Sequence, residues 1–442
     1  MRVNRDPSRV VLVRLAAVLA IVLAALAACG TPQPGPVVEG VTGEPATLPP
    51  TAAASPTAES TPTPELSPTP AETATPTPGP DLAELLQTPQ AAYLNADLAG
   101  AREGFAELAE LYPASAEPWI GQAAVAQREG DVDAALGLLE EAVAVEPGSF
   151  EAWRQLAVIY EQRQDHENAA NAYGALIGIA PDDPNLYVAR AMSLARLGRA
   201  EEAAADLVQA QALDPYRDYA WLNVAGAAYG SRSYQTAADI LSGGIEAYPG
   251  AVGLLVMRGR ANLAAGNPDA ALADFDAAAA ADPNSMAAHY GRGAALDALG
   301  RADEAVAAYQ QAGDIGASAG AGGLWEGFEA MSQAARIMAR TDAGRAYAYL
   351  QDKAVTYGQP PPILFGYALI EYERGNATAA LDNLNRLIEL FNYLPAYYWR
   401  GKINAEIGST GAARGDLEWY LDAQQAGPEA EDAYAVLESL GS

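Results

Sequence analysis

The chain has 442 residues, of which 56 are Asp or Glu and 26 are Lys or Arg, so its formal charge is −30. A surface of that sign repels nucleic acid and anionic lipid, which argues against both as partners of the folded part. One cysteine and two histidines exclude an internal disulfide and a zinc or iron site with the usual number of ligands, and we expect no cofactor.

Residues 1–28 have the organisation of a secretory signal. Four arginines precede residue 15, and residues 15–28 form an apolar run. The sequence Leu26-Ala27-Ala28-Cys29 resembles the lipobox of bacterial lipoproteins. That resemblance implies cleavage before Cys29, attachment of acyl chains such as palmitate, and an extracytoplasmic protein anchored to a bacterial cell membrane. An uncleaved membrane helix over residues 10–28 is the alternative, and it also leaves the rest of the chain outside the cytoplasm.

Residues 29–80 read as a tether between the lipidated cysteine and the folded part. Residues 30–80 contain 14 Pro, 11 Thr and no aromatic residue. Such a segment cannot bury enough apolar surface to form a core, so we predict disorder.

Residues 81–115 form an imperfect first repeat. Pro89 stands where a helix interior is expected, and proline removes a helical hydrogen bond. The pair Thr88-Pro89 instead predicts a helix start, with Thr88 as the N-cap and Pro89 as the first helical residue. We therefore expect a short helix near residues 81–87 and a shortened helix after it.

Residues 116–312 repeat a 34-residue pattern. With Ala116 as position 1, an aromatic residue is common at position 4, Gly at position 15, a bulky residue at position 24 and Pro at position 32. Position 20 is always alanine: Ala101, Ala135, Ala169, Ala203, Ala237, Ala271 and Ala305. Small residues at positions 8 and 20 let the two helices of a unit cross closely, and each hairpin leaves an apolar face for the next to cover.

This pattern resembles the tetratricopeptide repeat (TPR) family in its length and in its Trp…Ala-x3-Phe…Pro signature. The resemblance implies an all-α fold, in which helical hairpins stack into a right-handed superhelical solenoid. Such a solenoid has a concave groove lined by the first helix of each unit.

The pattern fails after residue 312. Five glycines within residues 313–323 predict an irregular linker. Residues 324–442 then read as degenerate repeats, with helices near residues 325–339 and 341–357, and they end in a cap helix over residues 428–440.

The one sequence that resembles a catalytic motif lacks the structural context that the motif needs, and we expect that the protein is not an enzyme. Residues 316–320 spell Gly-Ala-Ser-Ala-Gly, which matches the nucleophile elbow of α/β-hydrolases by letters. That elbow needs a preceding strand and a following histidine. Here a helix precedes, and His166 and His289 both lie upstream.

Peptide binding is the function that the resemblance implies. In TPR proteins, positions 2, 5, 9, 12 and 13 face the groove, and arginine and tyrosine are frequent at these positions here. We predict a protein–protein interaction scaffold that binds a peptide, such as an acidic segment, through bidentate arginine contacts and aromatic packing. The predicted groove residues are Arg128, Arg154, Arg196, Tyr219, Tyr229, Arg260, Tyr290 and Asp297.

Two alternatives stay open. The groove arginines could pair with carboxylates of the chain itself instead of a ligand. The C-terminal aromatic residues could form a glycan-binding surface, as in an assembly factor for cell-surface polysaccharide or pilus-type machinery; they are Tyr393, Tyr397, Tyr398, Trp399, Trp419 and Tyr420.

The Lys and Asn of the family's carboxylate clamp are absent, since Ile120 and Ala124 stand at those positions of the first regular unit.

Overall fold

A computed structural model describes residues 81–215, 218–319 and 323–441, which belong to a unit that begins at residue 77. Every secondary-structure element in these ranges is a helix, and no strand occurs there. None of these helices combines the length and the hydropathy needed to cross a lipid bilayer. The predicted signal, Cys29 and tether lie outside the described residues.

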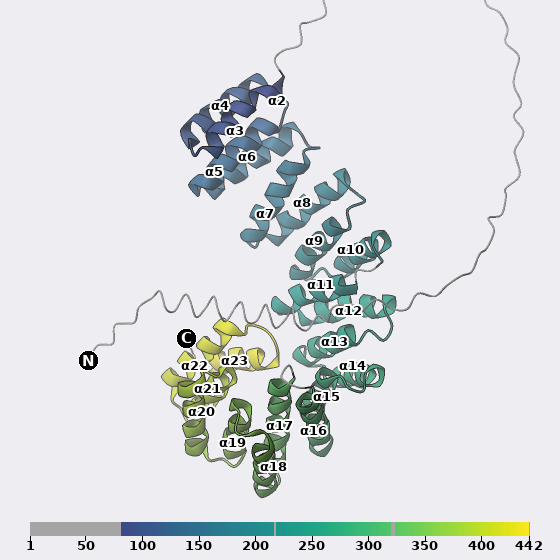
Figure 1. The fold of residues 1–442 in the computed structure, drawn as a ribbon, viewed down its shortest axis with the longest axis vertical. Helices are drawn as coiled ribbons and strands as arrows, with labels where there is room; N and C mark the ends of the chain where they lie inside the picture. The colour runs from purple at the N-terminus through teal and green to yellow at the C-terminus, as the bar shows by residue number, and fades with distance from the viewer. Residues whose placement is uncertain (1–80, 216–217, 320–322, 442) are drawn as a thin grey trace, which may run out of the picture. The chain divides into compact units, whose positions relative to one another are not determined.

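The regular repeats form successive helical hairpins (Figure 1). The first helices of the units are α5 (Glu117–Glu129), α7 (Phe150–Gln162), α9 (Pro184–Arg196), α11 (Asp218–Gly230), α13 (Val252–Ala264) and α15 (Met286–Ala298). The second helices are α6 (Val132–Val145), α8 (His166–Ile179), α10 (Ala200–Leu213), α12 (Tyr234–Ala247), α14 (Pro268–Ala281) and α16 (Ala302–Ser318). The predicted all-α solenoid of TPR type is confirmed.

Glycine at position 15 explains the tight turn between the two helices of a unit. Gly130 ends α5 with φ = 85°, a left-handed conformation that costs glycine little because it has no Cβ atom. Asp131 then caps α6, since its carboxylate accepts a hydrogen bond from the backbone N–H of Ala134 at 3.0 Å. One turn residue thus ends a helix and the next residue begins another.

Small residues let the paired helices approach closely, as predicted. The alanines at position 20 are fully buried in every regular unit. At position 8, a Cβ atom on Gly259 would lie 2.8 Å from the ring of Phe275, and one on Gly293 would lie 2.8 Å from the ring of Tyr309. The bulky residue at position 24 therefore fills the space that the small residue leaves, at the close-packed density of protein interiors.

The first repeat differs in detail from the prediction. Its helices are α2 (Leu82–Leu85), α3 (Gln87–Leu94) and α4 (Leu98–Leu111). Leu86, not Thr88, is the N-cap of α3, and Pro89 is the third helical residue. Proline is tolerated there because the first N–H groups of a helix have no partner within the helix.

The predicted linker begins later than expected. Helix α16 continues to Ser318, so Gly313 and Gly316 are helical. A Cβ atom on Gly316 would lie 2.6 Å from the Cα of Gly327 in α17 (Leu324–Ala339). These glycines bring two helix backbones together, which corrects the linker prediction for residues 313–318.

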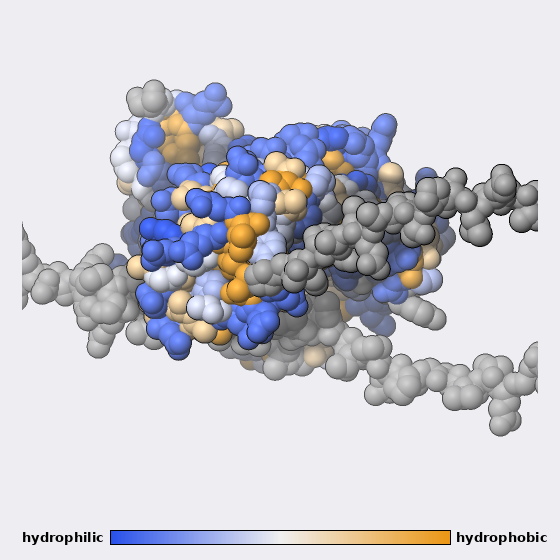
Figure 2. Space-filling model, turned by 90° about the horizontal axis from the view of Figure 1, so that it is seen from above, coloured by the Kyte–Doolittle hydropathy of each residue, from blue (hydrophilic) through white to orange (hydrophobic). Residues whose placement is uncertain are grey.

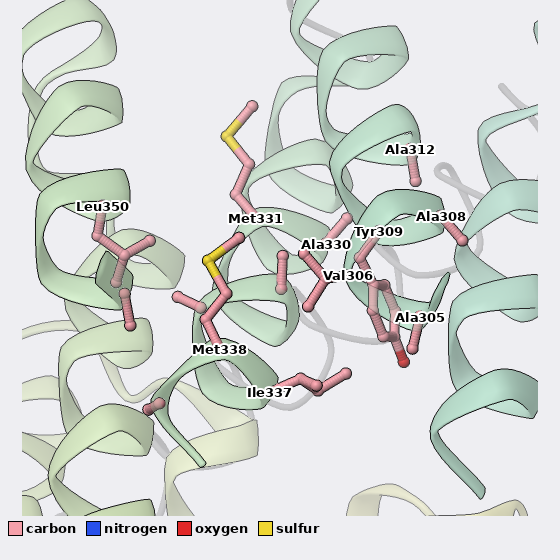
Figure 3. Close-up of a cluster of buried hydrophobic side chains, with 14 of the residues drawn as sticks. Ala305, Val306, Ala308, Tyr309, Ala312, Ala330, Met331, Ile337, Met338 and Leu350 are labelled. Atoms are coloured by element: carbon pink, nitrogen blue, oxygen red, sulfur yellow. The ribbon is translucent and has the colours of Figure 1, made fainter. Parts of the chain in front are cut away.

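The junction of α16 and α17 also holds a large hydrophobic core. Figure 3 shows Ala305, Ala308 and Ala312 on α16, with Met331 and Met338 of α17 among the buried side chains around it. The break in the repeat pattern is therefore not a break in the packing.

The C-terminal part consists of α18 (Ala343–Tyr357), α19 (Pro361–Glu373), α20 (Ala377–Phe391), α21 (Leu394–Glu406), α22 (Thr410–Ala423) and α23 (Pro428–Ser439). The helices predicted near residues 325–339, 341–357 and 428–440 correspond to α17, α18 and α23. The last helix contacts α21 and α22, and it also contacts α13 in the middle of the regular array (Figure 1).

Paired arginine and aspartate side chains join the two helices of three units. In each pair the residues are 16 positions apart, and the guanidinium donates two or more hydrogen bonds of 2.5–3.1 Å to a buried carboxylate. Such bidentate pairs are strong and fix orientation, so these arginines are structural. The pairs are Arg190 with Asp206, Arg258 with Asp274, and Arg400 with Asp416.

The outer surface is mostly polar. The face shown in Figure 2 is largely hydrophilic, with hydrophobic side chains gathered in small patches. That face has no single broad apolar area.

Candidate functional site

The predicted groove residues lie on the first helices, and these helices form one face. They are Arg128 on α5, Arg154 on α7, Arg196 on α9, Tyr219 and Tyr229 on α11, Arg260 on α13, and Tyr290 and Asp297 on α15. Helix α11 contacts α9 and α13, and α13 contacts α15, so residues on these helices share a continuous surface. We call this surface the first-helix face.

Two of these arginines already have partners within the chain. Arg128 donates a hydrogen bond of 2.5 Å to the carbonyl oxygen of Tyr93 and lies 5.0 Å from the centre of the Tyr93 ring. Arg154 donates two hydrogen bonds, of 2.6 and 2.8 Å, to Glu151 one turn before it. Arg154 thus shows the alternative of pairing with a carboxylate of the chain, whereas Arg128 is held by a backbone carbonyl oxygen and an aromatic ring.

Arg196 and Arg260 have no such partner. Among the described residues, neither guanidinium has a carboxylate oxygen within 4.0 Å. Burial and the charge of Arg196 lower the pKa of His166. Burial raises the pKa of Tyr229 to about 12, and the nearby charge of Arg260 offsets part of this rise. These two arginines retain their capacity to bind an external acceptor.

Tyr290 and Asp297 line a cavity of about 420 Å³. Its walls come from first helices α13 and α15, from α17 and Arg340 directly after it, from α21, from Tyr309 of α16, and from the start of α23. We call it the α15–α23 cavity. Its volume lies within the range of ligand pockets, about 300–1,000 Å³. Besides Tyr290, Asp297 and Tyr309, its charged and aromatic residues are Arg336, Arg340, Tyr398, Trp399, Lys402, Glu429 and Asp432.

A charge network forms one wall of the cavity. Arg336 donates hydrogen bonds to Asp297 at 2.6 Å and to Glu373 at 3.2 Å, and Arg340 contacts the same two carboxylates. Burial alone would raise the pKa of Asp297, but the two guanidinium groups lower it below its ordinary value. The network is thus charged and internally compensated.

A second set of groups surrounds Lys402. Its ammonium lies 2.9 Å from a carboxylate oxygen of Asp432 and 5.7 Å from the ring centres of Tyr398 and Trp399. The hydroxyl of Tyr398 donates a 2.6 Å hydrogen bond to the same carboxylate. This is an ammonium held by one carboxylate and two aromatic rings, with Coulombic and cation–π attraction acting together.

Helix α23, which lines the cavity, contacts residues up to 199 positions earlier in the chain. Arg232 donates two hydrogen bonds to Glu431, one of them at 2.6 Å, and its guanidinium lies 4.1 Å from the centre of the Tyr434 ring. Tyr234 donates to Glu431 at 2.7 Å and accepts from the N–H of Gly427 at 3.0 Å. We call these five residues the C-terminal contact.

Two residues of the C-terminal contact have positive φ. Arg232 occupies position 15, where four of the regular units have glycine, and it has φ = 62°. The turn of the repeat sets this conformation, because Gln164 at the same position has φ = 58°. Gly427 has φ = 116°, and a Cβ atom there would lie 3.1 Å from the hydroxyl of Tyr229.

The sequence analysis missed most residues of the cavity. Arg336, Arg340, Lys402, Glu429 and Asp432 lie in the degenerate region, where the register that assigns groove positions is lost. Two signals were present: only two lysines occur in the chain, and Arg232 replaces the expected glycine at position 15. Neither signal indicates which residues Lys402 or Arg232 contact in the folded chain.

No group of three His, Cys, Asp or Glu side chains suited to a metal ion occurs in the part of the chain that the structure describes. Ser318 of the Gly-x-Ser-x-Gly sequence is helical, and its hydroxyl donates to the carbonyl oxygen of Ile315 at 2.8 Å. It is therefore not placed on a strand-to-helix elbow. The arrangement of the site favours recognition by charge and aromatic contact.

The fold and its first-helix face define a helical-repeat solenoid. Residues 120–184, 188–252 and 256–319 of the regular array match the family model described as tetratricopeptide repeat. Members of that class bind peptides or proteins.

Among known proteins, the human protein O-mannosyl-transferase TMTC1 is 27% identical over 149 residues, which are 33% of this chain and 17% of that protein. The match thus spans about a sixth of the relative's length. Among solved structures, the Naa15/Naa10 assembly bound to HypK-THB has a TM-score of 0.37 at 14% identity and covers 82% of this chain and 68% of its own. Yeast Tom70 has a TM-score of 0.35 at 13% identity and covers 81% and 95%.

Proposed function

We propose that the protein is a lipid-anchored, extracytoplasmic scaffold that binds a peptide segment of a partner protein along its first-helix face, without catalysis. The observation that carries the proposal is the pair Arg196 and Arg260. These arginines lie on the predicted face of a strongly acidic chain, and no carboxylate of the described residues neutralises them.

The chemistry of this face suits an extended segment with acidic groups. Arginine binds carboxylates through two parallel hydrogen bonds, which gives both affinity and orientation. Tyr229 lies on α11 between the helices that carry the two arginines, with Gly427 close to its hydroxyl. The apolar groups of Val158 on α7 and Tyr219 on α11 are exposed. A peptide could therefore contact several units in succession.

The position of the partner can be tested by photocrosslinking. A photoreactive amino acid replaces Val158, which is 40% exposed on first helix α7, or Val208, which is 53% exposed on second helix α10. We expect the variant at position 158 to crosslink a partner in the native cell and the variant at position 208 to do so much less. Equal crosslinking at both positions would argue against a role for the first-helix face.

The anchor is a separate part of the proposal and rests on the sequence around Cys29. Because a thiol is the nucleophile that receives the diacylglycerol group, Cys29→Ser should abolish acylation. Mass spectrometry of the mature protein should show the added lipid in the original chain and none in the variant. An unmodified Cys29, or cleavage elsewhere, would contradict lipid anchoring.

A glycan-binding scaffold is the second candidate, and the structure favours it less. Most of the C-terminal aromatic side chains fill helix interfaces: Tyr393, Tyr398 and Tyr420 are buried, and Tyr372 packs edge-on against Trp399 at 5.1 Å between ring centres. Trp419 is the exposed member of this group and lies 5.8 Å from Tyr397. Two tilted rings offer less stacking area than an extended aromatic platform.

A further inference from the structure

One carboxylate that lines the α15–α23 cavity has no partner within the chain. The lining has three cations and three carboxylates, but Arg336 and Arg340 pair both with Asp297 and with Glu373, which lies outside the lining, and Lys402 pairs with Asp432. Glu429, the third carboxylate of the lining, is exposed, and no cation or hydrogen-bond donor among the described residues reaches its side chain. Glu429 lies in the first turn of α23, where the helix dipole favours a negative charge. Its carboxylate oxygens can still accept hydrogen bonds from a ligand.

Two tyrosine hydroxyls with unused hydrogen-bonding capacity line the same cavity. Tyr309 is only 3% exposed, and its hydroxyl has no hydrogen-bond partner among the described residues; the same holds for the hydroxyl of Tyr290. Neither hydroxyl oxygen is fully buried without a partner, so both can be reached from the cavity and can accept a hydrogen bond from an occupant. Burial, with an added effect of the Glu429 charge, raises the pKa of both phenols. They remain neutral at physiological pH and can accept hydrogen bonds.

The neighbouring turn of α23 shows which group would satisfy this set. Asp432 follows Glu429 by three residues and therefore lies on the same face of the helix. Asp432, Tyr398 and Trp399 hold the ammonium of Lys402. Glu429, Tyr290 and Tyr309 repeat the combination of one carboxylate and two aromatic residues, but the described part of the chain supplies no ammonium for them.

We infer that the α15–α23 cavity binds an alkylammonium group, with Glu429 as its counter-ion and the hydroxyls of Tyr290 and Tyr309 as further acceptors. A lysine side chain or an amino terminus of a bound peptide can supply this group. The inference depends on the proposed function only for the source of the ammonium. The acidic contacts expected at Arg196 and Arg260 are made on other helices.

Calorimetric titration of the full chain with small probes tests the inference and distinguishes the two sources. Nα-acetyl-lysine N-methylamide presents only a side-chain ammonium, and alanine N-methylamide presents only an α-ammonium. Nα-acetyl-norleucine N-methylamide has the lysine shape without the charge. We expect one of the two ammonium probes to bind and the norleucine probe to bind at least tenfold more weakly. Absence of binding by both ammonium probes would overturn the inference.

Two substitutions locate the binding. Glu429→Gln removes the charge at nearly constant shape and should weaken binding of the ammonium probe at least fivefold. Tyr309→Phe retains the ring and should weaken binding about twofold through loss of the hydroxyl. Glu418→Gln is the matched control, because Glu418 is exposed on α22 and does not line the cavity.

The control also guards against binding to the acidic surface in general. If Glu418→Gln weakened binding as much as Glu429→Gln, the attraction would be non-specific and the inference would be wrong. Arg196→Glu and Arg260→Glu should leave the binding of the small probe unchanged. If those arginine variants retain partner capture while Glu429→Gln loses the probe, the proposed function fails and the cavity assignment stands.

Discussion

At the scale of single residues, the arginines of the first-helix face differ in the groups that surround them: Arg154 is bound by a carboxylate of its own helix, and Arg196 is not. Arg196, Arg260 and Asp297 lie on first helices α9, α13 and α15. Whether an arginine is available depends on groups that the register does not specify. Arg154 meets Glu151 one turn away, whereas Asp297 is neutralised by arginines from α17, about 40 residues later.

Glu329 allows a test of burial at this scale. Burial raises its pKa, although Tyr393 donates a 2.8 Å hydrogen bond to its carboxylate. The folded state therefore holds this proton more tightly than the unfolded state, so the group's contribution to stability falls as pH rises above the ordinary carboxyl pKa. Glu329→Gln removes this fall in stability with rising pH, and the amide oxygen of glutamine can still accept the hydrogen bond from Tyr393.

We therefore expect Glu329→Gln to gain stability relative to the original chain as the pH rises from about 4 to about 7. Thermal unfolding at both pH values measures the gain. Glu418→Gln, with an exposed side chain, should show no such trend. A stability difference for Glu329→Gln that does not change with pH would contradict the assignment.

At the scale of helices, the sequence predicts which segments are helical and which helices pair into hairpins, but it predicts the end residues of the helices less well. The alanines at position 20 and the prolines at position 32 mark the hairpins because close crossing and helix ends have local causes. Gly313 and Gly316 misled the prediction because a missing Cβ atom permits either a flexible chain or close packing. Only the presence of Gly327 on the facing helix decides for packing, and no local pattern signals it.

A pair of glycine substitutions tests this interpretation. Alanine is favoured over glycine in a helix by about 1 kcal/mol, so Gly137→Ala should stabilise the protein, since nothing lies within 4 Å of a Cβ atom at that position in α6. Gly316→Ala should destabilise it by about 1–3 kcal/mol, because the new Cβ atom would meet the backbone of α17 at 2.6 Å. Chemical denaturation measures both. Stabilisation by Gly316→Ala would contradict close packing at α16 and α17.

At the scale of the whole molecule, a repeat pattern predicts contacts between neighbouring units and is silent on distant ones. The contact between Arg232 and Glu431 joins residues 199 positions apart, and together with Tyr234 it holds α23 against the middle of the array. The predicted cap helix thus has a second role, since it supplies Glu429 and Asp432 to the cavity.

Charge exchange tests the C-terminal contact. Arg232→Glu and Glu431→Arg should each destabilise the protein, and the double variant should recover part of the loss. Because both side chains are partly exposed, we expect a coupling free energy of about 1 kcal/mol. Thermal unfolding of the four proteins provides the double-mutant cycle. Additive effects of the two substitutions would show that the residues do not interact.

The central claim is that the first-helix face binds an acidic peptide segment through Arg196 and Arg260. The most direct measurement is the affinity of a peptide, selected from a random display library against the original chain, for the Arg196→Glu/Arg260→Glu variant. Arg199→Glu/Arg301→Glu is the matched control, because those arginines pair with Glu202 and Glu304 beside the turns of their hairpins. We predict that the first variant loses at least tenfold in affinity and that the control loses less than twofold. Equal affinity for both variants would contradict the claim.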